Sequence, residues 1–569
     1  MYAHIIPLLR TPIGVDGFDY RIPPDLILEP GMLVIVPFRK KQIIGLVANI
    51  MDTSAFSKKA ADVISRYTEI RFPLGALDLL SWLALTTFSS KPTVLKTWLR
   101  QLPKKPAKEE RKAQDKTPSP LPPTQEIEWT LDPRTKLIET AQASQGRTLI
   151  ITPWKHRALT FHEALIDSHV LLSDMGIRDY FAAWRQFTTN ESSTLITTRV
   201  GAWLSPFADT ILLDEPENDD HKQDDLSPRF DARRIAFWSH HQGYTSLKSF
   251  GLTPPIHVDD SAPEIPAKCI PIIRHPKGRS PIFFIEDASL QRLRSYEGPI
   301  TIIHPIQGDR SRIVCADCDW QAECTRCHFP LSADGRESIC RVCKQKTTAP
   351  LACPVCQSID LSKSIPGIET LKKGFAELEP DIHINWRTAS AMELEKAFPQ
   401  HSLILLTSGG FLGSSGSEDI RRNERLAIAY RRLGDTIRTS ESTLLIQSPE
   451  SLASSWKHLL TTEGYEAFRK AERLERKLFQ YPPHTRLIKV IVTGTEAQAL
   501  SQKDALVTRL ADFDIQGPFP VAFMPSTRMA RFVIHLRPKI EMKERALIST
   551  LTPFAKNAII DLDPIAFFR

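Results

Sequence analysis

The chain has 569 residues, of which 42% are hydrophobic and 24% charged, and its formal net charge is +7. This is the composition of an ordinary soluble protein with three or four domains, and it excludes a chain that is basic over its whole surface, so a nucleic-acid site must be a local patch. The first residues do not form a signal peptide, and the most apolar segment, 76–88, is too short to span a bilayer. We therefore expect a cytoplasmic protein without a membrane segment.

Residues 1–102 are predicted to form a β-rich domain that ends in helix. Short β-rich runs separated by Pro- and Gly-containing turns indicate a small barrel or half-open sheet, and residues 74–99 have a helical pattern. Arg39, Lys40 and Lys41 fall at a turn between two strands. A basic triplet at this place can meet DNA phosphates, although a solvated hairpin tip is the simpler interpretation.

The run DGFDYRIPPDLILEPGMLVIVPFRKKQIIGLVANI resembles the N-terminal domain of the primosomal protein N′ family of replication-restart helicases. In that family the domain binds the 3′ end of a nascent strand in a pocket built around a Phe-Asp-Tyr motif. The resemblance implies this role for Phe18, Asp19 and Tyr20, since a carboxylate accepts a hydrogen bond from a terminal sugar hydroxyl and an aromatic ring stacks on a base. The family usually has glycine where this chain has Arg39, which would narrow the pocket or add a phosphate contact.

Residues 103–126 are rich in Lys, Glu and Pro and are predicted to be a linker. The family places a winged-helix domain near this point, and the segment has no room for one. Residues 127–290 alternate strand and helix patterns, which predicts a parallel sheet covered by helices. By resemblance this sheet is the first of two RecA-like helicase lobes.

The residues that catalysis would need are altered in this first lobe. A phosphate-binding loop requires glycines and a lysine, but Asp132-Pro133-Arg134-Thr135-Lys136 occupies the corresponding stretch. Asp214 and Glu215 resemble the first half of the family's Asp-Glu-Glu-His motif, which would hold Mg²⁺. We treat Lys136, Asp214 and Glu215 as vestiges of a nucleotide and magnesium site. Without a phosphate-binding loop, packing or solubility is the favoured role of Asp214 and Glu215, and ATP binding of the usual kind is expected to be lost.

Residues 291–460 are predicted to form the second degenerate lobe, with a zinc-binding insertion at 312–360. Eight of the nine cysteines lie there in four C-x-x-C pairs, a pattern typical of structural Cys₄ zinc sites. We expect two Zn²⁺ ions in a nested arrangement, although side-by-side pairing is possible. The inner site would be Cys324, Cys327, Cys340 and Cys343, and the outer site Cys315, Cys318, Cys353 and Cys356.

Downstream of the cysteines, the later helicase motifs disappear. The stretch AYRRLGDTIRTSESTLLIQ stands where the family supplies arginine fingers, and the spacing of Arg431, Arg432 and Arg438 does not reproduce that motif. Because charge on a helix is usually a solvated face, these arginines are assigned no catalytic role. Residues 461–569 match the family again and predict a C-terminal α+β domain.

The fold class is therefore multidomain α/β, with a β-rich DNA-binding domain, two degenerate lobes, a double-zinc insertion and a C-terminal α+β domain. The leading hypothesis is a replication-restart factor without helicase activity. It would bind forked or branched DNA with a 3′ end and, by resemblance, single-strand DNA-binding protein and replicative-helicase loading proteins. One alternative is an active ATP-dependent 3′-to-5′ DNA helicase. A second is a zinc-bearing scaffold that binds proteins.

Overall fold

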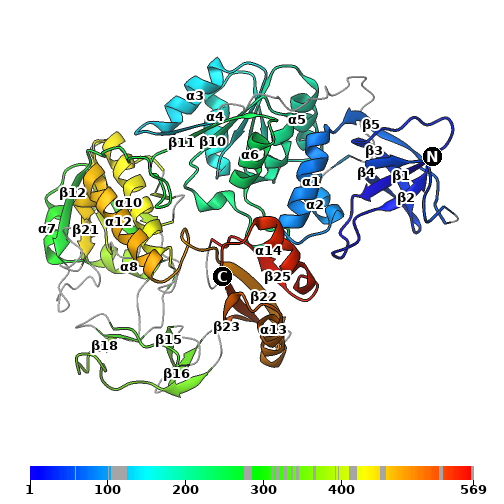
Figure 1. Cartoon of the computed structure of the whole chain (residues 1–569). Helices are drawn as coiled ribbons and strands as arrows, with labels where there is room; N and C mark the ends of the chain where they lie inside the picture. Colours follow the sequence, from blue (N-terminus) through cyan, green and yellow to red (C-terminus); the bar gives the residue numbers. More distant parts are fainter. Residues whose placement is uncertain are drawn as a thin grey trace. The chain divides into compact units, whose positions relative to one another are not determined.

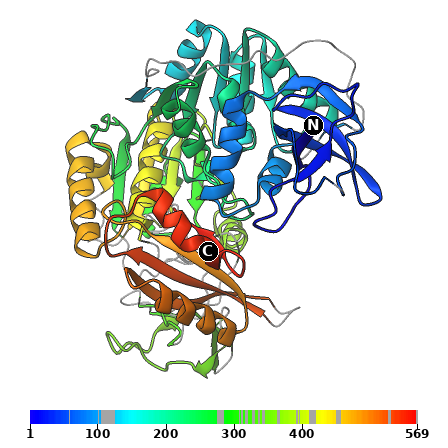
Figure 2. The same ribbon diagram turned by 45° about the vertical axis from the view of Figure 1, so that its right-hand side comes forward.

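The computed structural model describes the chain except for a set of short segments. These are residues 58, 100–101, 104–124, 274–284, 307, 309–312, 316–319, 326–329, 335–336, 341–344, 363–366, 391–392, 395, 409–419, 449–455, 525–528 and 566–569. The described residues divide into two compact units (Figure 1, Figure 2). Unit 1 contains Met1–Gly251 and Ile540–Ile565, and unit 2 centres on Leu252–Lys539.

Unit 1 begins with the predicted β-rich domain. Its antiparallel sheet has the order β2-β1-β4-β3-β5. The strands are β1 (Tyr2–Pro7), β2 (Phe18–Arg21), β3 (Met32–Phe38), β4 (Lys41–Met51) and β5 (Ser65–Arg71). Two helices follow, α1 (Leu74–Thr86) and α2 (Lys91–Trp98), rather than one continuous helix. The break has a local cause, because Ser90 caps α2 by accepting a hydrogen bond from the N–H of Thr93.

The larger part of unit 1 is a six-stranded parallel sheet with the order β6-β11-β10-β7-β9-β8. Its strands are β6 (Gln125–Trp129), β7 (Arg147–Ile151), β8 (Ser168–Leu171), β9 (Ser193–Thr197), β10 (Thr210–Asp214) and β11 (Ser246–Gly251). Helices α3 (Pro133–Ala143) and α4 (Lys155–Ala164) pack on one face. Helices α5 (Ile177–Thr189) and α6 (Ala232–His241), with the 3₁₀ helix η1 (Arg199–Phe207), cover the other (Figure 1). The strand and helix alternation read from the sequence is thus confirmed.

The chain returns to unit 1 at its end through α14 (Glu544–Leu551), η4 (Thr552–Phe554) and β25 (Ile559–Asp561). A buried ion pair fixes this return, because Lys222 Nζ lies 2.6 Å from Asp561 Oδ1 and neither side chain is more than 4% exposed. Arg234 adds ion pairs to Asp563, at 2.7 Å, and to Glu544. The last segment is therefore part of the first unit's structure.

Unit 2 contains a second parallel sheet, with the order β12-β21-β20-β13-β19. Its strands are β12 (Lys268–Ile273), β13 (Ile300–His304), β19 (Ile384–Thr388), β20 (Leu403–Leu406) and β21 (Thr443–Ser448). Helices α7 (Asp287–Arg294) and α8 (Ile368–Leu378) pack in one core with the sheet, and α10 (Arg422–Thr439) contacts β12. Because β12 pairs with β21, the range predicted for the first lobe, 127–290, includes a strand of the second sheet.

The rest of unit 2 consists of the cysteine-rich insertion and a smaller sheet. In the insertion, β14 (Val314–Cys315) pairs with β18 (Leu361–Ser362), and β15 (Leu331–Asp334), β16 (Glu337–Cys340) and β17 (Lys346–Thr348) form a small antiparallel sheet. After α12 (Thr462–Leu478), β22 (Ile488–Gly494), β23 (Phe513–Met524) and β24 (Met529–Pro538) pair antiparallel beside α13 (Glu496–Arg509). The multidomain α/β class is confirmed.

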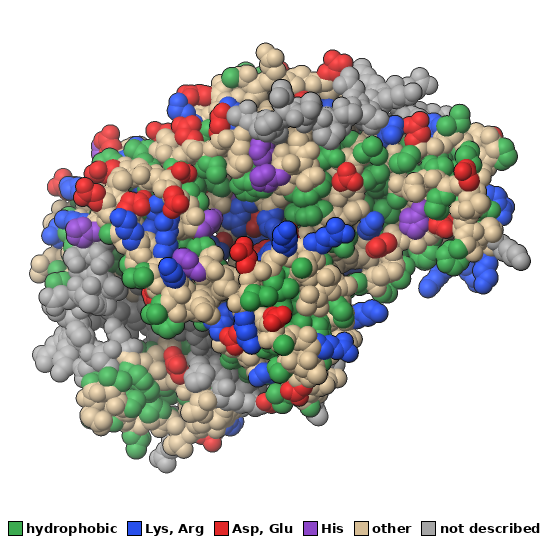
Figure 3. All heavy atoms as spheres, in the orientation of Figure 1, with side chains coloured by type: hydrophobic (Ala, Val, Ile, Leu, Met, Phe, Trp, Pro, Cys, Tyr) green, Lys and Arg blue, Asp and Glu red, His purple; other side chains and the backbone are tan. Residues whose placement is uncertain are grey.

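The surface agrees with the small net charge. On the face drawn in Figure 3, acidic and basic side chains intermingle rather than gather by sign. A search of the described helices finds none that is both long and apolar enough to cross a membrane.

Candidate functional site

The predicted acidic pair lies at the carboxyl edge of the first sheet. Asp214 is the last residue of β10, between the ends of β7 and β11. The turn from β6 to α3 and the start of α4 lie at the same edge, because all these strands run parallel. Ligand sites of open parallel sheets form at this edge. This is therefore the place where nucleotide chemistry would occur.

A single arginine from α4 neutralises the acidic pair. Arg157 Nε and Nη2 donate to the two carboxylate oxygens of Asp214 at 2.6 and 2.8 Å, and Thr152 Oγ1 donates to the same carboxylate at 2.7 Å. Arg157 Nη1 also donates to Glu215 Oε1. The other carboxylate oxygen of Glu215, Oε2, accepts a hydrogen bond from Asn218 Nδ2 at 2.8 Å. Arg157 is 3% exposed and Asp214 is fully buried. Both carboxylates are thus occupied by protein donors.

Burial and the charge of Arg157 shift the pKa of Asp214 in opposite directions. Burial raises the pKa of Asp214 above its ordinary value, while the charge of Arg157 acts to lower it. Glu215 follows in the left-handed backbone region at φ 50°, a conformation that costs a non-glycine residue energy and that recurs at functional sites. The backbone therefore turns tightly at Glu215, and Arg157 forms ion pairs with the carboxylates of Asp214 and Glu215.

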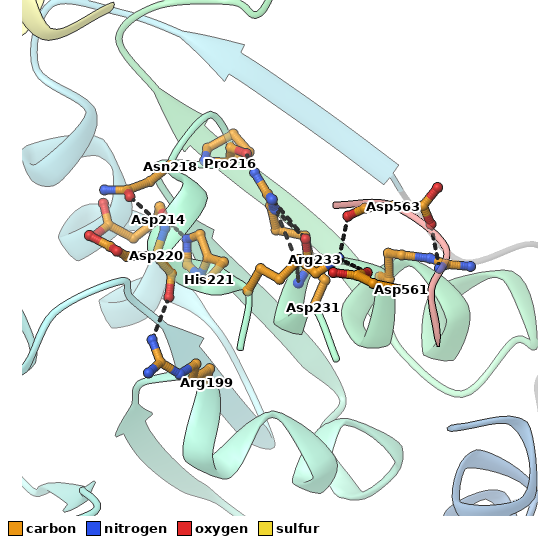
Figure 4. Close-up of polar contacts among 12 residues, drawn as sticks. Arg199, Asp214, Pro216, Asn218, Asp220, His221, Asp231, Arg233, Asp561 and Asp563 are labelled. Carbon is orange, nitrogen blue, oxygen red and sulfur yellow. Dashed lines mark hydrogen bonds and ion pairs between the residues drawn. The ribbon is translucent and has the colours of Figure 1, made fainter. Parts of the chain in front are cut away.

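His221 supports the same turn from the 3₁₀ helix η2 (Asp219–His221), as Figure 4 shows. Its Nε2–H donates to the carbonyl oxygen of Asp214 at 2.8 Å, so Nδ1 is the unprotonated nitrogen. Burial, followed by the charge of Arg233, lowers the pKa of His221 to about 4. Burial also acts to raise the pKa of Asp231, but Arg233 outweighs it and the value falls to about 2. Arg233 further donates to the carbonyl oxygen of Pro216 at 3.1 Å (Figure 4).

The connection that would carry a phosphate-binding loop is a short turn. Only Thr130, Leu131 and Asp132 separate the end of β6 from Pro133, the first residue of α3. Proline has no N–H to offer a phosphate, and the N–H of Thr130 already donates to the carbonyl oxygen of Gly251 at 2.9 Å. Lys136 instead forms an exposed ion pair with Glu139 at 3.2 Å.

The space above this turn is filled by side chains. A Cβ atom on Gly251 would lie 2.3 Å from the ring of Trp129 and 2.7 Å from Glu217 Oε2. The indole of Trp129 and the carboxylate of Glu217 therefore pack directly on the strand end where a nucleotide would approach.

The arginines of helix α10, in unit 2, also have structural roles. Arg431 is fully buried, and it donates to the carbonyl oxygens of Leu459, at 2.7 Å, and Pro263. Burial lowers the pKa of Arg431 to about 10. Arg438 pairs with Asp435 at 2.7 Å on its own helix. The expectation that this helix charge is a solvated face is wrong for Arg431 and also for Arg432, which is 9% exposed.

The N-terminal domain holds Asp19 between two polar neighbours. His4 Nδ1 lies 2.8 Å from Asp19 Oδ1, and Ser54 Oγ donates to Asp19 Oδ2 at 2.6 Å. Burial acts to raise the pKa of Asp19, but the hydrogen bonds from Ser54 and His4 lower it below its ordinary value. The group is therefore a carboxylate at neutral pH, with lone pairs left to accept a further hydrogen bond.

Phe18 connects this carboxylate to the basic turn. The ring of Phe18 lies 5.5 Å from that of Phe38, and the Arg39 guanidinium lies 5.7 Å from the Phe38 ring. Arg39 and Lys40 form the exposed two-residue turn between β3 and β4, and Lys41 begins β4. Arg39 has φ 54°, the left-handed conformation that favours glycine. This accounts for the glycine that the resembling family usually has at this position.

Tyr20 takes a different position from Phe18 and Asp19. It is 4% exposed, and its hydroxyl donates to the carbonyl oxygen of Pro37 at 3.0 Å. Its ring is part of the domain core, so any contribution to binding would come from holding β2 against β3.

Three cysteines of the predicted outer zinc site converge. The Sγ atoms of Cys315, Cys353 and Cys356 all lie within 4.8 Å of one another. The N–H of Val355 donates to Cys353 Sγ at 3.4 Å, which suits a C-x-x-C turn around a metal thiolate. Cys315 of the first pair thus lies beside both cysteines of the fourth pair, an arrangement compatible with nesting, and the cluster could hold a metal ion. Cys318 lies outside the described residues.

The predicted inner site is described only in part. Cys324 and Cys340 are both buried in a small core with Leu331. Cys327 and Cys343 lie outside the described residues. The second zinc site therefore remains a prediction.

Sequence reasoning missed three partners of the predicted residues, namely Arg157, His4 and Ser54. Arg157 had a usable signal, because an arginine at the buried phase of α4, four residues before Phe161, must find an acid. His4 and Ser54 reach Asp19 only through strand pairing and loop closure, for which the sequence carries no local signal.

Comparison with known proteins identifies the two ends of the chain. Residues 8–100 match the family described as "3'DNA-binding domain (3'BD)", and residues 477–565 match "Primosomal protein N C-terminal domain". The sequence is also similar to proteins named "Replication restart protein PriA". Identity is 21% over 369 residues for that of Borreliella burgdorferi, 24% over 437 for Chlamydia trachomatis and 22% over 470 for Haemophilus influenzae.

These similarities cover part of each relative. They span 56%, 63% and 70% of this chain, and 54%, 56% and 62% of the three relatives in the same order. The chain therefore spans little more than half the length of the curated relatives that it matches.

Proposed function

We propose that the chain is a member of the primosomal protein N′ (PriA) family, a replication-restart factor that binds branched DNA and does not hydrolyse ATP, because residues 8–100 and 477–565 match two domains of that family. Its DNA target is a fork with a free 3′ end, and it acts in the cytoplasm. The observation that carries the second half of this proposal is the pairing of Arg157 with Asp214 and Glu215.

The N-terminal domain is the proposed reader of the 3′ end. Asp19 is a partly buried carboxylate that can accept a hydrogen bond from a terminal sugar hydroxyl. A 3′-phosphate would bring negative charge to the same place and be repelled. The ring of Phe18 packs against Phe38, which contacts Arg39 at the exposed turn. Lys40 and Lys41 add positive charge there that can attract the phosphate backbone.

The two parallel sheets are proposed to be RecA-like lobes that have lost the nucleotide. Mg²⁺ binding would require oxygen ligands from Asp214 or Glu215, and Arg157 already uses these oxygens. A metal ion that displaced the guanidinium from these carboxylates would leave a buried arginine without its partners, which costs several kcal/mol. The three-residue turn before Pro133 offers no amide cradle in exchange. Lys136, Asp214 and Glu215 are then vestigial, and Arg157 has replaced the metal as the counter-charge.

The insertion is proposed to hold two structural Zn²⁺ ions. Cys315, Cys353 and Cys356, with Cys318, would bind one, and the inner four cysteines the other. Four thiolates leave no open coordination position, so these ions would stabilise the insertion and supply no chemistry. Single-strand DNA-binding protein and replicative-helicase loading proteins are the proposed partners, by resemblance to the family alone.

Two measurements with one fork sequence, prepared with a 3′-hydroxyl or with a 3′-phosphate end, test this proposal. We expect the protein to bind a fork ending in a 3′-hydroxyl more tightly than the same fork ending in a 3′-phosphate. We also expect no ATP hydrolysis above background with either fork. Turnover stimulated by the fork and lost in Asp214→Ala would refute the second half and favour the helicase alternative. Binding to neither fork would favour the scaffold alternative.

A further inference from the structure

The loop after β4 presents an unusual aromatic side chain. Among the described phenylalanines only Phe56 and Phe479 are exposed, and Phe56 is the more exposed of the two at 66%. A single exposed apolar residue needs no explanation by itself. The surroundings of Phe56 suggest a role for it, because its loop is hydrogen-bonded to the strand that carries Asp19.

One hydroxyl joins Phe56 to Asp19. Ser54 Oγ donates to Asp19 Oδ2 at 2.6 Å and accepts a hydrogen bond from the N–H of Phe56 at 3.0 Å. Further bonds hold the turn, since the N–H of Ser57 donates to the carbonyl oxygen of Ser54 at 3.2 Å and that of Lys59 to the carbonyl oxygen of Phe56 at 2.8 Å. The position of the Phe56 backbone is therefore set relative to the carboxylate.

The far end of the loop is fastened to the same strand. The N–H of Arg21 donates to the carbonyl oxygen of Ala61 at 2.9 Å, and the Arg21 side chain pairs with Asp62 at 3.2 Å. Asp19 and Arg21 lie two positions apart on β2 and so on the same side of it. The loop is thus tied at both ends to the side of β2 on which Asp19 lies.

We propose that Phe56 forms a second wall of the DNA-end site and stacks on an unpaired base at or beside the 3′-terminal nucleotide, with exposed Lys59 near the phosphate. This inference rests on the proposed function of the N-terminal domain. An exposed aromatic ring on a loop that is hydrogen-bonded to a sugar-reading carboxylate, with a lysine three residues further on, has the features of a stacking platform for single-stranded DNA. Phe18 cannot supply this wall in the same way, because its ring packs against Phe38.

The test uses the full-length protein and an oligonucleotide fork whose 3′-terminal base is 2-aminopurine, which loses fluorescence when it stacks. Wild type is compared with Phe56→Ala, Phe56→Leu and Phe56→Tyr. Ile27→Ala is the control, because Ile27 is 72% exposed in the same domain and outside the proposed site. Thermal unfolding of each variant checks that these surface changes leave the fold intact.

We expect Phe56→Ala and Phe56→Leu to weaken binding about 5- to 150-fold, as the loss of one aromatic stacking contact does, and to abolish fluorescence quenching. Phe56→Tyr should restore both, and Ile27→Ala should change neither. The preference for a 3′-hydroxyl over a 3′-phosphate should persist in Phe56→Ala, because Asp19 supplies it.

Two results would overturn the inference, and they are distinguishable. If wild type prefers the 3′-hydroxyl but Phe56→Ala binds and quenches like wild type, the stacking wall is wrong and the proposed function stands. If wild type has no preference between the two ends, the proposed end-binding function fails and the inference fails with it.

Discussion

Arg157 and Asp214 form a buried ion pair with two parallel hydrogen bonds, at 2.6 and 2.8 Å, at the carboxyl end of β10. The guanidinium does more than approach the acid, because it uses both carboxylate oxygens and reaches Glu215 as well. One arginine thus supplies the positive charge that both acids face.

Arg157→Met should destabilise unit 1 by about 3–5 kcal/mol, because it leaves two buried carboxylates without their cation. Urea unfolding measures the loss. Lys155→Ala is the control, since Lys155 lies two residues earlier on the same helix and pairs with Asp174, but both side chains are more than half exposed. That control should unfold like wild type. A loss below about 1 kcal/mol for Arg157→Met would mean that the acids are neutralised in another way.

Cys353→Ser should lower the zinc content from two ions per chain to one. Its Sγ lies in the cluster with Cys315 and Cys356, so the outer site loses a ligand while the inner site keeps all four. Zinc in purified protein is measured by mass spectrometry. Cys269→Ser should retain both ions, because Cys269 is buried on β12 beside Tyr430 rather than in the insertion. Wild type without zinc would contradict the prediction.

Acid should weaken the fold partly through His221. Its pKa is about 4 in the folded protein against an ordinary 6.5, so between these values the unfolded chain binds a proton that the folded one does not. Stability therefore falls as the pH drops from 6.5 to 4, by up to about 3 kcal/mol from this residue. His221→Gln cannot titrate and should show a correspondingly flatter pH dependence in urea unfolding. Parallel curves for the two proteins would refute this assignment.

Asp19→Asn should remove the preference for a 3′-hydroxyl over a 3′-phosphate while leaving general DNA affinity nearly unchanged. The substitution keeps the shape of the side chain but removes the negative charge that repels a phosphate. Competition binding with the two end-modified forks measures the ratio. Asp25→Asn, which removes an exposed acid from the same domain, should keep the wild-type ratio. An unchanged ratio in Asp19→Asn would move the end-reading role to another residue.

The sequence predicted the elements well where local pattern decides them. Alternating strands and helices led to the first parallel sheet, and the C-x-x-C spacing led to the meeting of Cys315 with Cys353 and Cys356. It could not identify Arg157 as the partner of Asp214, because they are 57 residues apart in the chain and meet only when β7 and β10 pair. Arg431 had the same difficulty, since a charge on a helix is normally solvated and here it is buried.

The ion pair between Lys222 and Asp561 joins residues that are 339 positions apart. Unit 1 is therefore built from an early and a late segment of the chain, and most of unit 2 is formed by the residues between these two segments. A protease that cuts once within unit 2 would sever the polypeptide without separating its two fragments, because the C-terminal fragment still contributes α14 and β25 to unit 1. The nicked protein should migrate as one species on a sizing column and as two bands after denaturation.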